Sequence, residues 1–378
     1  MAINKEQNKL NVPHLRFPEF HGEWEKCKLG DIATLTKGSG ISKDQRSATG
    51  TPCILYGELY TTYKSEVINY VVSKTDISDK NLVRSCANDI IIPSSGETAI
   101  DISTARCVLS PDVLLGGDLN IIRLKDGDGR FFSYQLNGVR KHDIAKIAQG
   151  VSVVHLYGES IKGLTVSFPS NKEQQKISTL LSLIDERIAT QSKLIEKLES
   201  LIKGIVQKIV RNNKPNVRLA ECLECKSSTL QESEVCEQGT YPVYGANGIV
   251  GYLDNYSTEG EAVYIIKDGS GVGTVSYVTG KCSATGTLNI LQAKEGYSLQ
   301  YFYYLLKVFN FEPYKTGMAI PHIYFKDYGK AKVFCPSYTE QLQYARLLSA
   351  IESNLSIEIN IQTNLNLQKQ YLLRQMFI

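Results

Sequence analysis

Residues 150–157 read GVSVVHLY, and residues 317–324 read GMAIPHIY. Both segments have glycine first, histidine sixth and tyrosine eighth, so Gly150 aligns with Gly317 and His155 aligns with His322. A match at a fixed long offset indicates an internal duplication, in which one structural unit occurs twice along the chain. This duplication decides how the remainder of the sequence is organised.

The same register continues without a gap to the C-terminus. Pro169-Ser170 aligns with Pro336-Ser337, and Glu173-Gln174 aligns with Glu340-Gln341. Upstream of the repeated glycine the alignment is looser, and the first copy is longer by roughly 20 residues. The end of each copy and the segment that follows it therefore match best. This division predicts a common frame that carries two different contents.

A long helix is predicted at the end of each copy. Residues 171–210 contain no proline, and their aliphatic residues alternate at spacings of three and four, which is typical of a coiled-coil seam. The second helix, over residues 339–376, has a weaker seam and needs a partner, so we expect the two helices to pair antiparallel. The alternative is that each helix packs on its own domain. The predicted helix-pair interface comprises Leu181, Ile184, Ile188, Ile195, Leu198, Ile202, Ile205, Leu348, Ile351, Leu355, Leu365 and Leu372.

The segments upstream of each helix are predicted to be mixed and rich in strands. Short β-branched runs lie between clusters of glycine, aspartate, asparagine and serine. In the first copy these runs cover 53–56, 67–72, 89–93, 106–109, 119–124 and 164–168. In the second they cover 241–244, 249–253, 262–266, 272–278 and 287–292. One amphipathic helix is expected near 131–142 and another near 298–309.

The predicted fold class is therefore α+β, with two pseudo-repeated β-rich domains separated and followed by long helices. These helices are expected to pair as an antiparallel coiled coil. The predicted boundaries are an N-terminal tail at 1–21, a first domain at 22–169, a central helix at 170–213, a second domain at 214–336 and a C-terminal helix at 337–378.

Composition limits the class of protein only loosely. The chain has 378 residues and a formal net charge of +3, which neither requires nor excludes a nucleic-acid partner, because a local basic face matters more than the sum. The 22 tyrosines fit either a polar contact surface or ordinary strand positions. The start of the chain has no apolar run, and no stretch has the ~20 apolar residues of a membrane helix. The nine cysteines are therefore expected to be reduced thiols in a cytoplasm.

The sequence lacks the common enzyme motifs. It has no GxxxxGK[ST] loop, no HExxH and no Asp/Asn-Pro-Pro-aromatic sequence, so we expect no catalytic residues and no base methylation by this chain. The glycines of 269–273 precede a strand-like run, whereas a dinucleotide fingerprint requires a helix there. Cys222 and Cys225 form a single CxxC that lacks a second CxxC, so free thiols are favoured over a zinc site and no metal is expected.

Over essentially its full length, the layout of the chain resembles the specificity subunits of type I restriction-modification enzymes. Each motif is weak alone, and their order and duplication make the resemblance specific. The motifs that carry it are EWEKCKLGDIATLTKG (23–38) with NVRLAECLECKSS (216–228), DIIIPSSG (89–96) with AVYIIKDGSGVG (262–273), YPVYGANGIVGYLDNY (241–256), and FPSNKEQQKI (168–177) with CPSYTEQLQY (335–344). Two departures are Cys335 at the position of Phe168 and a second helix rich in asparagine and glutamine.

The resemblance implies a function in DNA recognition. Each recognition domain would read one half of a split, asymmetric site in double-stranded DNA, and half-sites about one helical turn apart are expected. The helices would act as a spacer and dock two methyltransferase subunits, which nuclease-translocase subunits join in the full complex. S-adenosylmethionine, ATP and magnesium would belong to those partners, with no cofactor bound by this chain. Two alternatives remain: a coiled-coil scaffold with two β-rich ligand-binding modules, and a self-contained nuclease.

Candidate DNA-binding residues are polar side chains on loops, where glycines allow close approach of the backbone. In the first domain they are Lys37, Ser39, Lys43, Ser94, Ser95, Glu97, Thr98, Gln149 and Ser152. In the second they are Tyr244, Asn247, Lys267, Asp268, Ser270, Thr285, Lys315 and His322. His155 and His322 occupy the same place in both copies, which favours a shared structural role over base reading.

Overall fold

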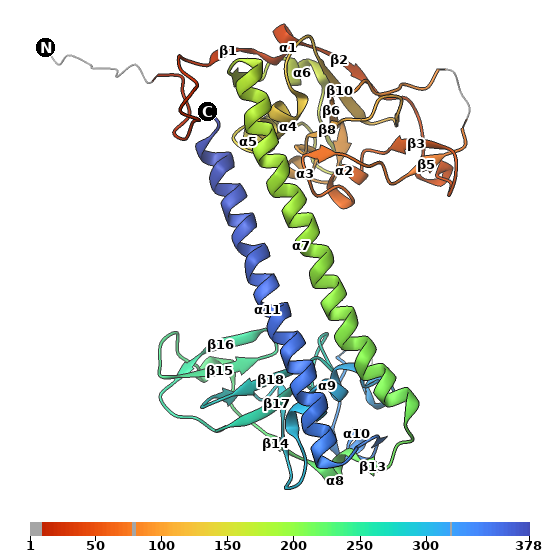
Figure 1. Cartoon of the computed structure of the whole chain (residues 1–378), viewed down its shortest axis with the longest axis vertical. Coiled ribbons are helices and arrows are strands. Elements are labelled where there is room, and N and C mark those ends of the chain that lie inside the picture. Colours follow the sequence, from red (N-terminus) through yellow and green to blue (C-terminus); the bar gives the residue numbers. More distant parts are fainter. Residues whose placement is uncertain (1–9, 78–80, 318–319) are drawn as a thin grey trace, which may run out of the picture. The chain divides into compact units, whose positions relative to one another are not determined.

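The computed structural model describes residues 10–77, 81–317 and 320–378. Met318 and Ala319, which belong to the repeated segment, lie outside the described residues. The chain divides into two units, one formed by Met1–Gln191 with Ile361–Ile378 and the other by Ser192–Asn360. The two long helices, α7 (Asn171–Asn212) and α11 (Tyr338–Gln375), each contribute one part to each unit. The predicted α+β class is confirmed (Figure 1).

Unit 1 contains short strands and helices, followed by the first part of α7. In chain order its elements are β1 (Glu25–Lys28), α1 (Leu29–Ile32), β2 (Ala33–Lys37), η1 (Lys43–Gln45, a 3-10 helix), β3 (Thr51–Ile54), α2 (Glu58–Thr61), β4 (Val67–Ile68), β5 (Lys74–Thr75), β6 (Asp89–Pro93), β7 (Ser95–Gly96), α3 (Ala99–Ile102), β8 (Arg106–Val108), β9 (Leu114–Leu115), β10 (Leu119–Leu124), α4 (Gly129–Asn137), α5 (Lys141–Ile147), β11 (Val154–His155), α6 (Gly158–Lys162) and β12 (Thr165–Phe168).

The main sheet of unit 1 has five strands in the order β2-β10-β6-β8-β4. Its central strand β6 reads DIIIP and is buried at every position, as expected of a strand covered on both faces. Ile90 of β6 pairs antiparallel with Ile122 of β10. A smaller sheet has the order β5-β3-β9, in which β3 and β9 run parallel.

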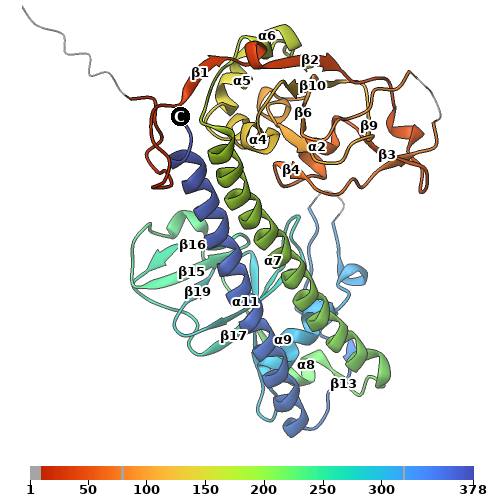
Figure 2. The same cartoon turned by 45° about the horizontal axis from the view of Figure 1, so that its top comes forward.

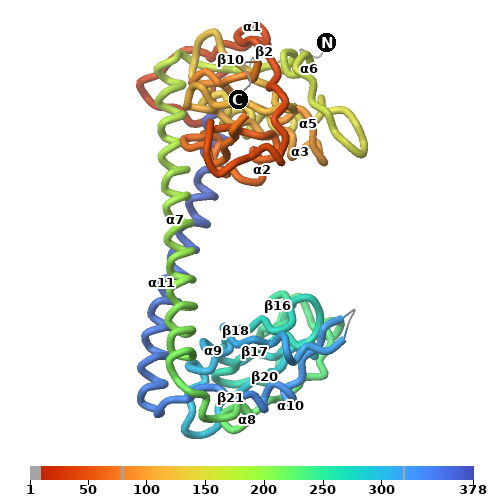
Figure 3. Tube along the Cα trace, turned by 90° about the vertical axis from the view of Figure 1, so that its right-hand side faces the viewer, coloured from red at the N-terminus to blue at the C-terminus, as the bar shows by residue number. Residues whose placement is uncertain are grey.

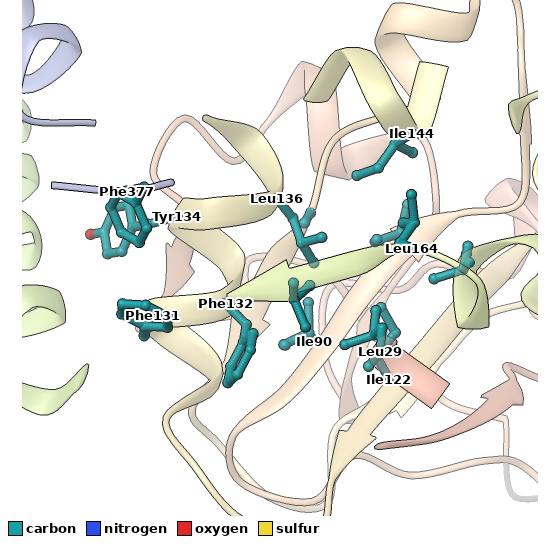
Figure 4. Packing of buried hydrophobic residues seen from close by; sticks show 14 of the residues in the cluster. Leu29, Ile90, Ile122, Phe131, Phe132, Tyr134, Leu136, Ile144, Leu164 and Phe377 are labelled. Carbon is teal, nitrogen blue, oxygen red and sulfur yellow. The ribbon is translucent and has the colours of Figure 1, made fainter. Parts of the chain in front are cut away.

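Helix α4 packs its aromatic residues into the core of unit 1 (Figure 4). The Phe131 ring lies 5.6 Å from Trp24 and 5.1 Å from Phe377, measured between ring centroids. Aromatic pairs at such distances contribute beyond their buried area. The last residues of the chain therefore belong to the core of the first unit.

Unit 2 begins within α7 and ends within α11. Between them lie β13 (Val217–Arg218), α8 (Leu219–Cys222), β14 (Leu223–Ser227), η2 (Glu232–Glu234, a 3-10 helix), β15 (Tyr241–Gly245), β16 (Gly248–Leu253), β17 (Glu261–Ile266), β18 (Val275–Thr279), β19 (Ser283–Ala284), β20 (Leu288–Ala293), α9 (Leu299–Val308), η3 (Glu312–Tyr314, a 3-10 helix), α10 (Phe325–Tyr328) and β21 (Lys332–Val333).

The sheets of unit 2 repeat the frame of unit 1. The order β14-β20-β17-β18 matches β2-β10-β6-β8, and the pair β13-β21 matches β1-β12. The parallel pair β15-β19 matches β3-β9. The units differ at the edges: β4 extends the main sheet of unit 1, whereas β16 forms a hairpin with β15 in unit 2 (Figure 2).

Three elements differ from the sequence-based prediction. The helix expected near 131–142 is two helices, α4 and α5, because the chain turns at Gly138. The strand expected at 67–72 is only Val67–Ile68. The strand expected at 272–278 is β18, which begins at Val275 because a turn occupies the preceding residues, with the Val272 amide bonded to the Gly269 carbonyl.

The Pro-x3-Glu-Gln motif fastens each long helix to its domain. The Gln174 amide donates to the Pro169 carbonyl at 2.8 Å, and its oxygen accepts from the Asp128 amide at 3.0 Å. Gln341 repeats both bonds, to the Pro336 carbonyl at 2.9 Å and from the Ser298 amide at 2.9 Å. Asp128 and Ser298 are the N-caps of α4 and α9. One glutamine therefore joins two helix starts in each unit.

A buried acidic residue provides a second attachment in unit 1. Asp185 of α7 accepts a hydrogen bond from the Tyr134 hydroxyl at 2.8 Å and forms an ion pair with Lys369 of α11 at 2.6 Å. Lys369 also forms an ion pair with Glu66. Burial alone would lower the pKa of Lys369, but the charges of Glu66 and Asp185 outweigh it and raise the pKa. Lys369 therefore stays charged and joins both long helices to the domain.

Unit 2 has the equivalent attachment with a different cation. Glu352 of α11 aligns with Asp185 in the register of the repeat, and it accepts hydrogen bonds from the Tyr303 and Tyr304 hydroxyls, both at 2.8 Å. Its cation is Lys307 of α9, at 2.9 Å. Burial would raise the pKa of Glu352, but the bonds from Lys307 and the two tyrosines lower it. The acid is thus common to both units, whereas the source of the cation is not.

The predicted seam residues occupy the cores of the two units. In unit 1, Leu181 and Ile184 of α7 share a cluster with Leu372 of α11. In unit 2, Ile202 of α7 shares a cluster with Leu348 of α11. The remaining predicted members are buried or half-buried: Ile188, Ile195, Leu198, Ile205, Ile351, Leu355 and Leu365. In unit 1 the start of α7 thus packs against the end of α11, which makes that pairing antiparallel.

Candidate nucleic-acid interface

The repeated glycine-histidine segment forms the same hairpin in both units. In unit 1 the Gln149 and His155 backbones exchange two hydrogen bonds, of 2.9 and 2.7 Å. In unit 2 Thr316 and His322 exchange the same two bonds at the same lengths. The hairpin is therefore part of the common frame, although the adjoining loops differ in sequence.

Glycine is required at the first position of each hairpin. Gly150 has φ +121° and Gly317 has φ +86°, a region that residues with a side chain rarely adopt. A Cβ atom on Gly150 would lie 2.1 Å from the Val153 carbonyl oxygen, and one on Gly317 would lie 2.3 Å from that of Ile320. The repeated glycine thus serves the same turn in each unit.

The segment after the central strand pairs with each hairpin, as strand β7 in unit 1 and as an isolated β-bridge in unit 2. In unit 1, Ser95 of β7 pairs with His155. In unit 2, Asp268 pairs with His322, and the Gly269 amide bonds to the Pro321 carbonyl. The sequence motifs DIIIPSSG and AVYIIKDGSGVG therefore both pass beside the repeated histidine, at Ser95 in unit 1 and at Asp268 in unit 2.

The two histidines differ in their side-chain contacts. The His322 Nδ1 atom lies 2.6 Å from Asp268 Oδ1, and the two side chains are 36% and 33% exposed. His155 is opposite Ser95 instead and stacks on Tyr157, with ring centroids 6.2 Å apart. The backbone role of the histidine is shared, as its recurrence in the sequence suggested, while the carboxylate contact belongs to unit 2.

Two candidate hydroxyl residues are buried. Ser94 is 4% exposed, and its hydroxyl, amide and carbonyl bond to Asp118 and Leu156. Thr285 is 1% exposed, and its hydroxyl lies 2.8 Å from that of Thr287. These two side chains hold the loops in place and do not face solvent.

The remaining candidates of unit 1 lie on the edge of the domain. Lys37 is exposed at the end of β2, and the Ser39 hydroxyl accepts a bond from the Val83 amide at 2.7 Å. Thr98 caps α3, accepting from the Asp101 amide. Three further exposed candidates lie near the hairpin: Glu97, Gln149 and Ser152.

Lys43 lines a cavity of about 930 Å³ between η1 and α2. The cavity also contains Arg46, Tyr56 and Asp118, whose backbone and carboxylate bond to Ser94 beside the hairpin. Arg46 lies 3.5 Å from the buried Glu58, across the cavity wall. Asp118 thus connects the polar and charged lining of the cavity to the hairpin of the common frame.

Further lining residues of the cavity escaped prediction from the sequence. They are Ser42, Gln45, Arg46, Tyr56, Thr61 and Thr62. The charged stretch SKDQR at 42–46 was the available signal for the first three of them. Tyr56 could not be linked to that stretch before the fold brought η1 and α2 together.

The candidates of unit 2, called its rim below, are connected in part by hydrogen bonds. The Thr285 amide bonds to the Tyr244 carbonyl, and the Lys267 amide bonds to the Thr287 carbonyl. Asn247 lies exposed between β15 and β16, and Ser270 is exposed in the loop after β17. Lys315, next to the hairpin, forms an ion pair with Glu312 at 2.5 Å. The rim therefore presents amide, hydroxyl and cationic groups together.

The helix pair of unit 1 has a separate surface feature. A groove of about 720 Å³ lies between the α7 residues 180–191 and the α11 residues 361–372. Leu183 is 54% exposed and Ile361 is 39% exposed along it. Arg187 and Glu186 supply charge beside these aliphatic side chains. Such a mixture is typical of a protein-contact surface.

Neither a metal site nor a membrane span is found in the described part of the chain. In residues 10–77, 81–317 and 320–378, no group of three or more histidine, cysteine or acidic residues has the arrangement of a metal site. Among the helices within those ranges, none combines the length and the apolar character that crossing a membrane requires.

Similar proteins share this organisation. A putative type I specificity subunit of Mycoplasma genitalium is 24% identical over 94% of both chains, and a type I restriction enzyme specificity subunit of Methanocaldococcus jannaschii is 26% identical over 55% of this chain and 46% of its own. The crystal structure of a type I restriction-modification S subunit from M. genitalium matches with a TM-score of 0.72, at 20% identity, over 97% of this chain and 99% of that one. A further structure, from a study of complex assembly in the type I system, matches with a TM-score of 0.53, at 14% identity, over 97% of this chain and 99% of that one.

The family model described as the type I restriction modification DNA specificity domain matches this chain twice, over residues 21–200 and 213–367. These matches include both globular parts and most of both long helices. They agree with the duplicated frame found in the sheets and hairpins. The chain therefore belongs to the family of type I restriction-modification specificity subunits, whose function is to recognise a DNA site, and it has two tandem specificity domains.

Proposed function

We propose that each unit reads one half of a bipartite, asymmetric DNA site. The observation that carries this proposal is that one shared frame of strands and hairpin carries two different rims, which are the sets of candidate side chains around the hairpin in each unit. Both units have the same sheet order, hairpin and histidine position, while the side chains around them differ. A shared frame supports the same docking on a duplex, and different rims support different base sequences.

The reading groups proposed for unit 1 surround its cavity and hairpin. Lys43 and Arg46 are the cations there, and such side chains commonly donate to guanine in the major groove. Glu97 and Gln149 add an acceptor and an amide on exposed loops. Half-site reading in this unit is therefore assigned to the groups around η1, α2 and β7.

The reading groups proposed for unit 2 lie along its rim. Asn247 presents an amide, which can pair with both polar atoms of an adenine edge. Lys267 and Ser270 lie on the loop that pairs with the hairpin. Since residues 232–234 are Glu-Ser-Glu where unit 1 has Lys-Asp-Gln, the two units differ in charge at the corresponding 3-10 helix.

The helix pair is proposed to dock two methyltransferase subunits. The groove in unit 1, with exposed Leu183 and Ile361, supports an apolar contact there. In unit 2, Leu201, Leu347 and Ile357 are exposed aliphatic residues on the helices and could form a similar apolar contact. Nuclease-translocase subunits would then join the assembled methyltransferase. S-adenosylmethionine, ATP and magnesium are assigned to those partners.

The chain itself is proposed to be a non-catalytic subunit that works on DNA in the cytoplasm. Its sequence lacks the motifs of a base methyltransferase or a P-loop translocase. The purified chain alone is therefore expected neither to methylate nor to cleave DNA. Methylation should require added methyltransferase and S-adenosylmethionine.

Methylome sequencing of cells with and without the gene tests the proposed function. Deletion should remove methylation at one split motif and leave other methylated motifs unchanged. Restoring the gene on a plasmid should restore that motif, which excludes a secondary mutation. If deletion leaves methylation at every split motif intact in cells that retain the methyltransferase gene, the proposal is refuted.

A further inference from the structure

Exposed aliphatic side chains lie at the tips of the two repeated hairpins. Val151 is 96% exposed and Val153 is 53% exposed in unit 1, and Ile320 is 58% exposed in unit 2. Burying such a side chain stabilises a protein relative to leaving it in water. The chain forgoes this stabilisation at the equivalent place in both units. Figure 3 shows the unit 1 hairpin extending from its domain beside α5.

Val153 of unit 1 and Ile320 of unit 2 occupy matching positions of the repeat. Val153 and Ile320 each lie two residues before the histidine, and each presents its carbonyl oxygen to the glycine of the turn. The loops next to the hairpins differ, because each reads a different half-site in the proposed function. A feature that persists beside such different loops serves a task that both half-sites share.

The hairpin lies on the same surface as the proposed reading groups. Its returning strand pairs directly with Ser95 in unit 1 and with Asp268 in unit 2. Paired strands lie only about 5 Å apart, so a duplex that contacts the loop also meets the hairpin. Ser152, exposed between the two valines, gives the unit 1 tip a polar group as well.

Aliphatic side chains can make favourable contacts with only some parts of a duplex. They cannot neutralise phosphates, which require cations or hydrogen-bond donors. The apolar parts of DNA are the faces of the stacked bases and the thymine methyl group. Proteins that bend DNA insert aliphatic or aromatic wedges between base pairs at such places. Both features of the tip, exposure and apolar character, fit this use.

We propose that the two hairpin tips are apolar wedges that contact the base stack at one step of each half-site and unstack it. Val151 and Val153 form the wedge of unit 1, and Ile320 belongs to that of unit 2. The wedge rests on the proposed function, since it requires the reading loops to face DNA. It adds a contact that is independent of sequence to the contacts that read bases.

The test uses the full chain assembled with its methyltransferase subunits. The probe is a synthetic duplex that carries the split motif found by methylome sequencing, with 2-aminopurine placed at successive steps of each half-site. Fluorescence of this base rises when it is unstacked. The wild-type complex should raise the signal at one step in each half-site. The variant V151S/V153S should lose the rise in the half-site of unit 1, and Ile320→Ser should reduce it in the other.

Two controls separate the wedge from other effects. Val72→Ser changes a valine of unit 1 that is 57% exposed and lies between β4 and β5, outside the hairpin, and it should behave as wild type. The conservative variant V151I/V153I should keep the rise. Affinity for the duplex should fall about tenfold for V151S/V153S, which is about 1.4 kcal/mol, because the apolar contact that offsets the cost of unstacking is lost. All of these changes are on the surface, so the fold should be retained.

The possible outcomes are distinct. An unchanged fluorescence rise in V151S/V153S would overturn the wedge. Loss of methyltransferase assembly in that variant, seen as a change in the mass of the complex, would also overturn it and would mark the tip as a protein contact. Failure of the wild-type complex to distinguish the motif duplex from a scrambled one would instead refute the proposed function, and the wedge with it.

Discussion

At the scale of single residues, Lys369 is a nearly buried cation that joins two helices. Its side chain is 13% exposed and faces two carboxylates, from Glu66 and Asp185. Its counterpart in the first helix, by the register of the repeat, is Ile202. The aligned position of the first helix therefore carries no cation, and in unit 2 the ammonium group comes from Lys307 of α9 instead. Lys369 is an added device that ties the end of α11 to α7 and to the domain.

Removing this cation should destabilise unit 1. Lys369→Met keeps much of the side-chain volume but leaves two acidic groups buried without their partner, which costs about 3 kcal/mol. Urea unfolding of the full chain, followed together with hydrogen exchange of the amides of residues 361–375, measures the effect. Protection should be lost in unit 1 and retained in unit 2.

A matched control is available on α7. Lys203 is exposed, and Lys203→Met should change the free energy of unfolding by at most about 0.5 kcal/mol, as is usual for surface substitutions. Equal stability of Lys369→Met and wild type would show that the ion pairs contribute nothing net. The anchoring role of Lys369 would then be wrong.

At the scale of elements, the Glu352 carboxylate joins α11 to α9 within unit 2. Because hydrogen bonds from Lys307 and two tyrosines lower the pKa of Glu352, its ionised form is favoured in the folded state. The contribution to stability is complete above the ordinary glutamate pKa of 4.5 and disappears as the pH falls through the lowered value. Burial raises the pKa of Tyr303 to about 12, so that tyrosine remains a donor throughout this range.

Glu352→Gln should therefore lower the free energy of unfolding at neutral pH by about 2 kcal/mol and weaken its decline in acid. The urea midpoint of unit 2, followed from neutral pH to below 4.5, measures this difference. Glu199→Gln, at an exposed position of α7, serves as the control and should retain the wild-type pH profile. An identical acid profile for Glu352→Gln and wild type would contradict the assignment.

Elements with a strong repeating pattern were predictable from the sequence. Both long helices follow from their alternating aliphatic residues, and the recurrence of His155 and His322 indicated a shared structural role, although it did not predict the hairpins. The break at Gly138 was not predicted, since one glycine is tolerated within many helices. The burial of Ser94 and Thr285 was also hidden, because a serine or threonine near a glycine looks the same in a loop that is packed or exposed.

The candidate site was only partly predictable for a related reason. Lys43 was identified, but the cavity around it depends on η1 and α2 meeting across the fold. The contact between Arg46 and Glu58 spans residues that share no sequence pattern. The His322–Asp268 contact likewise joins side chains that are far apart in the chain. Contacts of this kind are determined by the tertiary structure and leave no periodic signal.

At the scale of the whole molecule, duplication separates two requirements. The sheet order, the hairpin, the glutamine that joins two helix starts and the acidic residue that bonds to tyrosine recur in both units, so these features maintain the frame. The 3-10 helix recurs but changes from Lys-Asp-Gln in η1 to Glu-Ser-Glu in η2, and β15 pairs with the next strand β16 whereas β3 pairs with the more distant β5, so these features distinguish the half-sites. Changes in one rim should therefore leave the reading of the other half-site intact.

Methylome sequencing of rim variants tests this central claim most directly. One strain carries Lys43→Ala with Tyr56→Ala in unit 1, another carries Asn247→Ala with Ser270→Ala in unit 2, and a control carries Lys26→Ala at an exposed position of β1. Each rim variant should relax the bases of one half of the split motif, a different half in each strain, with the control unchanged. The claim that each unit reads its own half-site would be contradicted if either rim variant accepted a wider range of bases in both halves of the motif. It would also be contradicted if neither variant changed the bases accepted in any half.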